Sequence, residues 1–343
     1  MTFDIEDFAA LRDYLTAKGS VKPDETVSFT NLRGGVSNRT VKIAWADGRE
    51  WVLKQALEKL RVNEDWFSDP ERIGVEAKAL RCLNQLAPPG TTPMFIFEDM
   101  KNYLIGMEAI PEDHANWKEV LLLGRVESNH FEQFGLLLGA IHRQSSNRKY
   151  ELSRTFADTS YFESLRLEPY YLHTAHKVPA AGAFLNSLAQ ETLFHKDCLV
   201  HGDFSPKNTL IYHGKLILLD YEVVHFGDPA FDVGFALTHF LSKAHHLPNR
   251  RAQLASAAGL FWQVYFQEIH RSDWAAALEP RCVSHALACL LARVAGKSPL
   301  EYLTSTEAAR QREVVLSLLT HPPKSVPDLI TAFIYKIENY AEN

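Results

Sequence analysis

The sequence predicts an α+β protein with two lobes, an N-terminal lobe built on an antiparallel sheet and a mostly helical C-terminal lobe. Its 343 residues suggest two domains by length alone. Residues 1–110 contain short apolar and alternating runs separated by turns, which are typical of strands. Residues 111–343 have mostly helical spacing, apart from short strand-like runs in the middle. We therefore expect the lobes to meet after residue 110.

In the N-terminal lobe, the acidic segment 1–15 predicts an amphipathic helix and not a signal peptide. The runs 40–45 and 50–55 flank a turn that contains Gly48, and this pattern is typical of a β-hairpin. Residues 72–80 predict a helix. Residues 103–107 predict a buried strand that leads into a connector closed by Pro111.

In the C-terminal lobe, apolar residues with helical spacing between 131 and 141 predict a core helix. The runs 209–212 and 215–219 are separated by His213 and Gly214, which suits a two-residue hairpin turn. An apolar helix is expected over residues 233–241.

The most informative motif spans the predicted hairpin: His201-Gly202-Asp203, then Asn208, then Asp220. Phosphoryl transfer needs positioning, neutralisation of phosphate charge and a carboxylate beside the attacking hydroxyl. Asp203 is our candidate for that carboxylate. Asn208 and Asp220 offer the hard oxygen ligands that Mg²⁺ prefers, and the hairpin returns both to one end. Four elements in this order and spacing predict a site for phosphoryl transfer from Mg-ATP.

Three residues in or near the motif are expected to support it. His201 should orient the loop by hydrogen bonding. Asp232 should cap the following helix or hold the catalytic loop through backbone N–H groups. Glu222 is either a carboxylate close to the metal or a polar strand residue, and the sequence leaves both readings open.

The motif His-Gly-Asp-x-x-x-x-Asn, with Asp220 and the segment Gly-Asp-Pro-x-x-Asp at 227–232, resembles the aminoglycoside phosphotransferase and choline kinase superfamily. The resemblance implies a protein-kinase-like two-lobed fold, ATP and Mg as cofactors, and a small molecule bearing a hydroxyl group as acceptor. Protein kinases carry Arg after the loop His and Asp-Phe-Gly at the metal strand. Gly202 and Asp220-Tyr221-Glu222 stand there in this chain, which favours the small-molecule branch.

The resemblance also implies a nucleotide-binding N-terminal lobe. Gly34 and Gly35 would let the backbone approach a phosphate closely, and two donor side chains follow them. Lys54 would contact the α- and β-phosphates and be held by Glu76 on a helix. The remaining nucleotide-binding candidates are the donors Ser37 and Asn38 and the adenine-contacting segment, represented by Met107, Glu108 and Ile110.

Around the lysine, the resemblance narrows to methylthioribose kinase, through Lys54-Gln55-Ala56-Leu57, Leu60-Arg61-Val62, Asp65-Trp66, Arg72 and Glu76. The C-terminal lobe departs from that family, which has a shorter polar residue in place of Asn208 and Pro in place of Tyr221. The family's adjacent arginine pair is reduced to Arg293. The acceptor therefore stays open among a sugar or methylthioribose-like metabolite, choline or ethanolamine, homoserine and an aminoglycoside.

Arg293 and Lys297 are spaced by one helical turn, so we expect them to share a helix face. They are candidates for binding the acceptor, or else charges that complement a helix end. The tripeptide Gly-Lys-Ser at 296–298 is not a P-loop, because Leu291 stands where that motif requires Gly.

The composition argues against several classes of binding partner. The net charge is -6 with no basic tract, which argues against nucleic acid and anionic membranes. No apolar run approaches 18 residues, so we expect no membrane span. Four cysteines without a Cys-x-x-Cys motif indicate a cytoplasmic protein without a disulfide framework or zinc site. A homodimer and a non-catalytic nucleotide-binding protein of the same fold are alternatives that the sequence leaves open.

Overall fold

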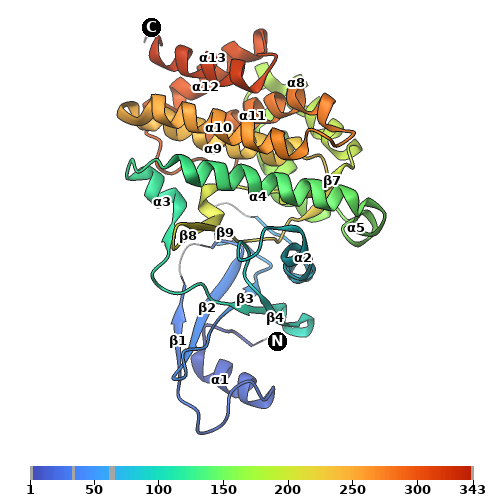
Figure 1. Ribbon diagram of the computed structural model, residues 1–343, viewed down its shortest axis with the longest axis vertical. Coiled ribbons are helices and arrows are strands. Elements are labelled where there is room, and N and C mark those ends of the chain that lie inside the picture. The colour runs from blue at the N-terminus through green and yellow to red at the C-terminus, as the bar shows by residue number, and fades with distance from the viewer. Residues whose placement is uncertain (1–2, 33–34, 62–65, 341–343) are drawn as a thin grey trace.

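The computed structural model describes residues 3–32, 35–61 and 66–340. It has an N-terminal lobe with an antiparallel sheet and a larger helical lobe, which lie one above the other in Figure 1. The predicted fold class is therefore confirmed. The predicted lobe boundary after residue 110 falls between the last strand of the N-terminal sheet and the first strand of the helical lobe.

The N-terminal lobe has one five-stranded sheet in the order β1-β2-β3-β5-β4, with every neighbouring pair antiparallel. The predicted hairpin at Gly48 joins β2 to β3, and Gly48 has the positive φ of 89° that such a turn requires. The elements of this lobe are α1 (Phe8–Ala17), β1 (Val27–Asn31), β2 (Asn38–Trp45), β3 (Glu50–Ala56), η1 (Pro70–Arg72), α2 (Ile73–Leu86), β4 (Phe95–Asp99), η2 (Met100–Asn102) and β5 (Leu104–Glu108).

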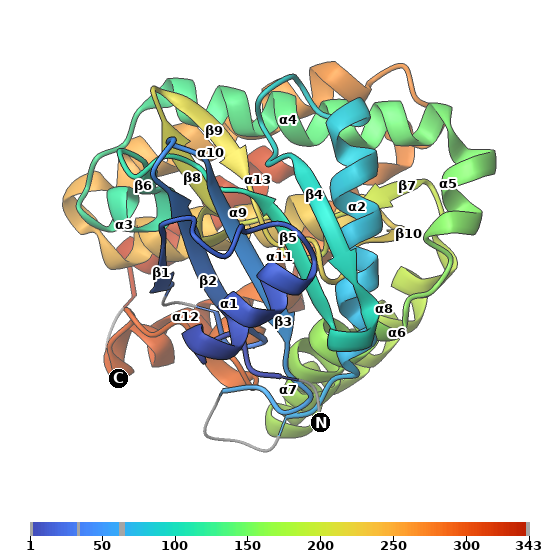
Figure 2. The ribbon, with the colours of Figure 1, turned by 90° about the horizontal axis from the view of Figure 1, so that it is seen from below.

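Alternation along β3 places Lys54 on the face toward the helical lobe. Leu53 packs with α1 in a small core on the outer face of the sheet, where Figure 2 shows α1 crossing in front of the strands. Because side chains alternate along a strand, Lys54 points to the opposite face, as does its partner in the register, Ile105. Ile105 belongs to the main core, together with Ala77 and Leu80 of α2.

The helical lobe contains two small sheets, of order β6-β8-β9 and β10-β7. The predicted turn at His213 and Gly214 joins β8 to β9, and both residues have positive φ, 47° and 73°. The short elements are β6 (Ala115–Asn116), α3 (Trp117–Leu122), α5 (Lys149–Thr155), α6 (Ser160–Phe162), α7 (His173–Lys177), η4 (Pro179–Ala181), β7 (Cys198–Val200), η5 (Pro206–Asn208), β8 (Thr209–Tyr212), β9 (Lys215–Leu218), β10 (His225–Gly227), η6 (Pro248–Arg250) and η7 (Ala275–Ala277).

Long helices form the main core of this lobe. The predicted core helix is α4, and its apolar side chains are buried together with aromatic residues of α10. These helices are α4 (Ser128–Asn147), the π-helix η3 (Glu163–Leu172), α8 (Gly182–Phe194), α9 (Ala230–His246), α10 (Arg251–Ile269), α11 (Leu278–Ala295), α12 (Ser305–Thr320) and α13 (Val326–Glu338).

The prediction that Arg293 and Lys297 share a helix face is wrong. Helix α11 ends at Ala295, because Gly296 leaves the helical conformation with a ψ of -173°. A Cβ at Gly296 would lie 2.6 Å from the carbonyl oxygen of Ala292, so this tight exit depends on glycine. Lys297 lies beyond the helix end.

In the described part of the chain, one helical stretch is long and apolar enough to cross a membrane by length and composition. It covers residues 275–295, in η7 and α11, and 67% of its most apolar window is buried inside the protein. The core helix of a soluble protein passes the same test.

Candidate active site

The loop after β7 carries the motif His201-Gly202-Asp203. Gly202 adopts a φ of 76°, and a Cβ there would lie 2.8 Å from a methyl group of Val223. An L side chain at this position would therefore be strained and would clash. This is a physical reason for glycine where protein kinases carry arginine.

Asp232, in the first turn of α9, holds this loop from behind. Its carboxylate accepts hydrogen bonds from the backbone N–H of His201 at 2.6 Å and of Gly202 at 2.8 Å. Asp232 is fully buried, and His142 of α4 is its third partner at 3.2 Å. Of the two predicted arrangements, the structure shows the second, with Asp232 bound to the backbone of the loop that carries Asp203. Burial opposes ionisation, but these partners lower the pKa of Asp232 below its ordinary value.

The imidazole of His201 links the motif to the strand that carries Asp220. Its Nδ1 accepts a hydrogen bond from the N–H of Asp203 at 3.1 Å, and its Nε2 lies 3.2 Å from the carbonyl oxygen of Leu219. These partners select the neutral tautomer with the hydrogen on Nε2. Burial lowers the pKa of His201, which keeps this tautomer at neutral pH. The imidazole thus orients the loop, as expected.

Arg166 lies against the candidate base, and the sequence analysis did not identify it. Its guanidinium Nη2 is 2.8 Å from Oδ2 of Asp203, and its Nε donates to the carbonyl oxygen of Gly202 at 2.7 Å. Arg166 comes from η3, a π-helix that also contains Pro169. The available sequence signal was a lone arginine between two leucines, which does not reveal a partner 37 residues away.

Asn208 and Asp220 meet at one end of the β8–β9 hairpin, as predicted. The N–H of Leu219 donates to the carbonyl oxygen of Asn208 at 2.8 Å. The side-chain nitrogen of Asn208 donates to the carbonyl oxygen of Asp203 at 3.1 Å, which leaves the amide oxygen for another ligand. Asp220 has a positive φ of 71°, a conformation that costs free energy for a non-glycine residue and is common at functional sites.

Lys54 makes two short ion pairs, one within the N-terminal lobe and one to the helical lobe. Its Nζ lies 2.7 Å from Oε1 of Glu76 on α2 and 2.6 Å from Oδ1 of Asp220. Burial alone would favour neutral Lys54, but the two carboxylates outweigh it and raise the lysine pKa. Burial likewise opposes ionisation of Asp220, and Lys54 overcomes it and holds the pKa of Asp220 below its ordinary value. Both groups are therefore charged at neutral pH.

Arg72 ties the segment after the glycine pair to Glu222. It is fully buried, and it contacts the carbonyl oxygen of Ser37 and, at 3.1 Å, a carboxylate oxygen of Glu222. The Asn38 amide nitrogen donates to Ser37 Oγ at 3.1 Å and to Glu222 at 3.2 Å. Both donors of Asn38 are therefore engaged within the protein, and its contact with a phosphate stays a prediction. Glu222 is a buried ion-pair partner and not a strand residue.

The other nucleotide-binding candidates lie at the rim of the N-terminal sheet. Gly35 is exposed, whereas Gly34 lies outside the described residues. Met107 is buried at the end of β5. The backbone N–H of Glu108 already donates to Met94, and that of Ala109 to Glu50, so both are engaged within the sheet. These bonds engage the two N–H groups alone, and adenine contacts by the backbone from Glu108 to Ile110 stay a prediction.

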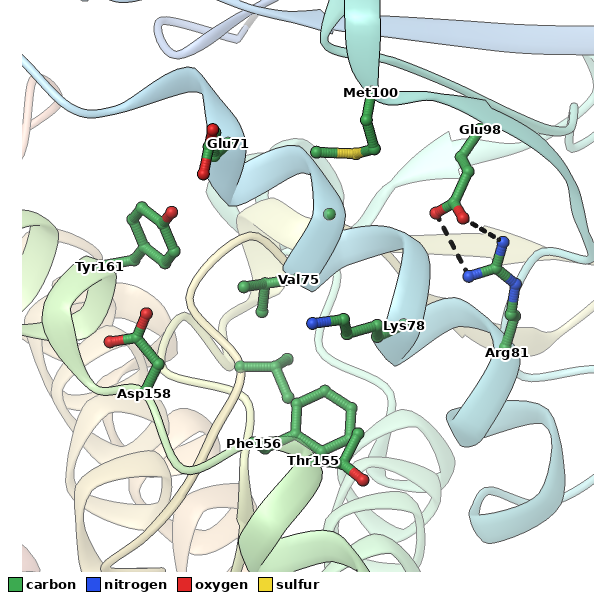
Figure 3. A pocket seen from close by; sticks show the side chains of 12 residues that line it. Glu71, Val75, Lys78, Arg81, Glu98, Met100, Thr155, Phe156, Asp158 and Tyr161 are labelled. Carbon is green, nitrogen blue, oxygen red and sulfur yellow. Dashed lines mark hydrogen bonds and ion pairs between the residues drawn. The ribbon is translucent and has the colours of Figure 1, made fainter.

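A separate cavity of about 380 Å³ lies along the outer side of α2. Figure 3 shows Val75 and Lys78 of α2 facing Asp158 and Tyr161 of the helical lobe across it, with Arg81 paired to Glu98 at one side. The predicted site residues are not among the residues that line this cavity. It is therefore distinct from the candidate active site.

The site residues define the class of protein before any comparison. A carboxylate, two oxygen-bearing side chains and an ion-paired lysine converge where the two lobes meet, as in kinases. Within the described residues, no three His, Cys, Asp or Glu side chains form a metal site by themselves. Asn208 and Asp220 nevertheless fit a magnesium ion that arrives with phosphate oxygens as its other ligands.

Residues 28–279 match the family described as "Phosphotransferase enzyme family", APH, so the chain belongs to that family. It is a small-molecule kinase, as the sequence analysis predicted.

Relatives with curated names are methylthioribose kinases. The protein from Klebsiella pneumoniae (strain 342) is 25% identical over 275 residues, which cover 73% of this chain and 68% of that protein. The protein from Cronobacter sakazakii is 24% identical over 356 residues, with 88% of each chain covered. The structure of the amicoumacin kinase hAmiN, in complex with AMP-PNP, Ca²⁺ and Ami, superposes with a TM-score of 0.57 at 16% identity, covering 96% of this chain and 99% of that one. At that identity, the likeness shows the fold.

Proposed function

We propose that the protein transfers the γ-phosphoryl group of Mg-ATP to a hydroxyl group of a small molecule in the cytoplasm. One observation carries the proposal. Asp203, Asn208, Asp220 and Lys54 come from four segments and are joined into one site by hydrogen bonds and ion pairs. A non-catalytic protein of this fold would be expected to lack the base, the lysine or a metal ligand, and this chain has all of them.

The reaction follows from the position of Asp203. As the acceptor oxygen forms its bond to the γ-phosphorus, the bond from that phosphorus to the bridging oxygen of ADP breaks. The acceptor hydroxyl loses its proton to Asp203, and ADP leaves with the electron pair of the broken bond. Arg166 and Asp232 hold the loop so that this carboxylate stays directed at the acceptor.

The lobe interface would hold the nucleotide. Asn208 and Asp220 would bind the magnesium ion, which neutralises phosphate charge when bound. Lys54, kept charged and oriented by Glu76, would contact the α- and β-phosphates. The hydroxyl of Ser37 accepts from Asn38 and keeps its own hydrogen for a phosphate oxygen. The backbone around Gly35 and Ile110 would cover the phosphates and the adenine.

The named relatives favour a sugar or a methylthioribose-like metabolite as acceptor. Choline, ethanolamine, homoserine and aminoglycosides are the alternatives. A cation–π site for choline would need accessible aromatic rings. Two of the aromatic residues that could build one, Trp262 and Tyr265, are buried in the core. This packing argues against choline.

The test measures ADP release by the full-length protein with Mg-ATP and a panel of acceptors, together with the shift in melting temperature caused by Mg-ATP. The panel contains methylthioribose, other pentoses, sugar acids, choline, ethanolamine, homoserine and aminoglycosides. We expect stabilisation by Mg-ATP and acceptor-dependent ADP release with one class. If Mg-ATP neither stabilises the protein nor releases ADP with any member, the proposed function is wrong.

We expect Lys54→Met to impair the use of nucleotide. The variant removes a charge that contacts phosphates and also leaves Glu76 buried without its cation, so kcat/KM for ATP should fall about 10²-fold. Steady-state kinetics with varied ATP measures the effect. Lys101→Met, a surface substitution outside the site, serves as the control. Unchanged ATP kinetics in Lys54→Met would contradict the proposed role.

A further inference from the structure

Four side chains with hydrogen-bond donors gather in the helical lobe beyond the catalytic loop. His239 and Lys243 come from α9, Arg293 from the last turn of α11, and Tyr302 from the segment before α12. Lys243 is 0% exposed, His239 5% and Arg293 7%. The ammonium of Lys243 lies 5.2 Å from the centre of the Tyr302 ring, and Arg293 acts electrostatically on both α9 residues. We refer to these four residues as the donor cluster.

The donor cluster is only partly satisfied, because Nη1 of Arg293 donates to Tyr170 and Ser298 while other donors have few or no acceptors. The ammonium of Lys243 makes one long hydrogen bond, 3.4 Å, to the carbonyl oxygen of His239. Nε of Arg293 and the hydroxyl of Tyr302 are buried and have no hydrogen-bond partner among the described residues. Buried donors without acceptors cost free energy, and native proteins rarely leave several of them together. A ligand with acceptor oxygens is the kind of partner that such donors require.

The charge around the donor cluster is positive. The neighbouring acid, Glu301, is already paired with Lys118. Burial, together with the charges of Lys118 and Arg293, lowers the pKa of Lys243 to about 7. Burial and the same cations also lower the pKa of His239. In a chain whose net charge is -6, this local excess of cations favours an anion.

Helix α9 connects the donor cluster to the catalytic loop. Its first turn carries Asp232, which binds that loop. His239 and Lys243 lie seven and eleven residues further along, about 10 and 16 Å along the helix axis at about 1.5 Å per residue. Lys207, on the loop that follows Asp203, also acts electrostatically on His239. Figure 1 shows α9 running through the helical lobe behind α4.

A second connection leads to the candidate base through side chains. Nη1 of Arg293 donates to the hydroxyl of Tyr170 at 3.0 Å. Tyr170 lies four residues after Arg166 in η3, and Arg166 contacts Asp203 at 2.8 Å. The donor cluster is therefore linked to Asp203 through η3.

We propose that the donor cluster binds an anionic group of the acceptor, so that the substrate is a hydroxylated small molecule carrying a carboxylate or a phosphate. The inference rests on the proposed function and names its substrate class. An acidic acceptor and ATP repel each other, and cations beside the acceptor offset that repulsion. The same cations disfavour choline and aminoglycosides, because these acceptors are positively charged.

The test compares acceptors that differ only in the acidic group, by isothermal titration calorimetry of the full-length protein with and without Mg-ADP. The two sets are D-ribose, D-ribonate and D-ribose 5-phosphate, and glycerol, glycerate and glycerol phosphate. We expect at least one acidic member to bind more than 10-fold tighter than its neutral counterpart. Comparison of the acid with the phosphate ester identifies the group that is recognised.

Two variants test the assignment to these residues. Lys243→Met replaces a buried charge with an apolar side chain of similar length, a change that buried sites tolerate. It should lower the affinity for acidic ligands about 10- to 100-fold, which corresponds to the loss of a charge-assisted hydrogen bond. The affinity for neutral ligands should not change. Tyr302→Phe should lower the affinity for acidic ligands to a smaller extent. The control is Lys324→Met, at an exposed lysine between α12 and α13.

The outcomes separate this inference from the proposed function. If no acidic member binds tighter than its neutral counterpart, or if both variants keep the wild-type preference, the anion site is wrong. Release of ADP with neutral or cationic acceptors alone would also overturn the anion site while supporting the kinase. A preference for acidic ligands that is lost in Lys243→Met, without stabilisation by Mg-ATP, would support the anion site and overturn the kinase proposal.

Discussion

Asp203→Asn is expected to lower kcat by roughly 10²- to 10⁴-fold, the range for losing a general base. The amide keeps the shape of the side chain and an oxygen for Arg166, which lies 2.8 Å from the carboxylate. ATP binding should therefore be preserved, because none of the residues proposed to hold the nucleotide is changed. Single-turnover kinetics gives the chemical step, and the melting shift with Mg-ATP gives the nucleotide affinity.

The matched control for this variant is Asp24→Asn, at an exposed aspartate far from the motif in sequence. It should behave like the wild type in both measurements. If Asp203→Asn retains nearly full kcat, Asp203 is not the base. If the variant loses ATP binding together with activity, the carboxylate supports the nucleotide site and the division of roles proposed above is wrong.

Asp232→Ala is expected to cost about 3 kcal/mol or more of folding free energy and to lower kcat as well. The substitution leaves two buried N–H groups, those of His201 and Gly202, without their acceptor, and it also removes a partner of His142. Urea denaturation at neutral pH measures the free energy of unfolding. Asp232→Asn keeps one acceptor oxygen, so its free energy of unfolding should fall by less than that of Asp232→Ala.

The pH dependence gives this prediction a second readout. The folded-state pKa of Asp232 is lowered below the ordinary value of 3.8, so its ionised form stabilises the folded protein above that pH. This contribution is lost as the pH falls through the lower folded-state value. The difference in stability between wild type and Asp232→Ala should therefore narrow in acid. A variant as stable as the wild type at neutral pH would show that the loop is held by other contacts.

Local sequence signals were sufficient for much of the fold and for the centre of the site. The turns at Gly48 and at His213-Gly214 depend on residues that tolerate positive φ, and each joins the two strands that it was expected to join. The spacing from Asp203 to Asn208 and Asp220 spans one hairpin, so local geometry alone brings these residues together. The pairing of Lys54 with Glu76 was implied by the family resemblance, and the two side chains form an ion pair in the structure.

The corrections concern chain ends and contacts between distant segments. The prediction that Arg293 and Lys297 share a helix face was wrong because α11 ends before Gly296. Helical spacing alone does not indicate where a helix ends. The Asn38 amide points to Glu222, which lies 184 residues away in the sequence. Periodicity carries no information about such a partner.

The sequence by itself determined the class of fold, the reaction type and the order of the catalytic motif, because each depends on residues close together along the chain. The tertiary structure decided which buried charges meet. Arg166 reaches Asp203, Arg72 reaches Glu222, and Lys243 keeps a single long hydrogen bond, to the carbonyl oxygen of His239. The physical reason is desolvation. A charge costs free energy when it is buried without a partner. Whether a charged side chain has a partner therefore affects stability only after packing has removed the surrounding water, which depends on the tertiary structure.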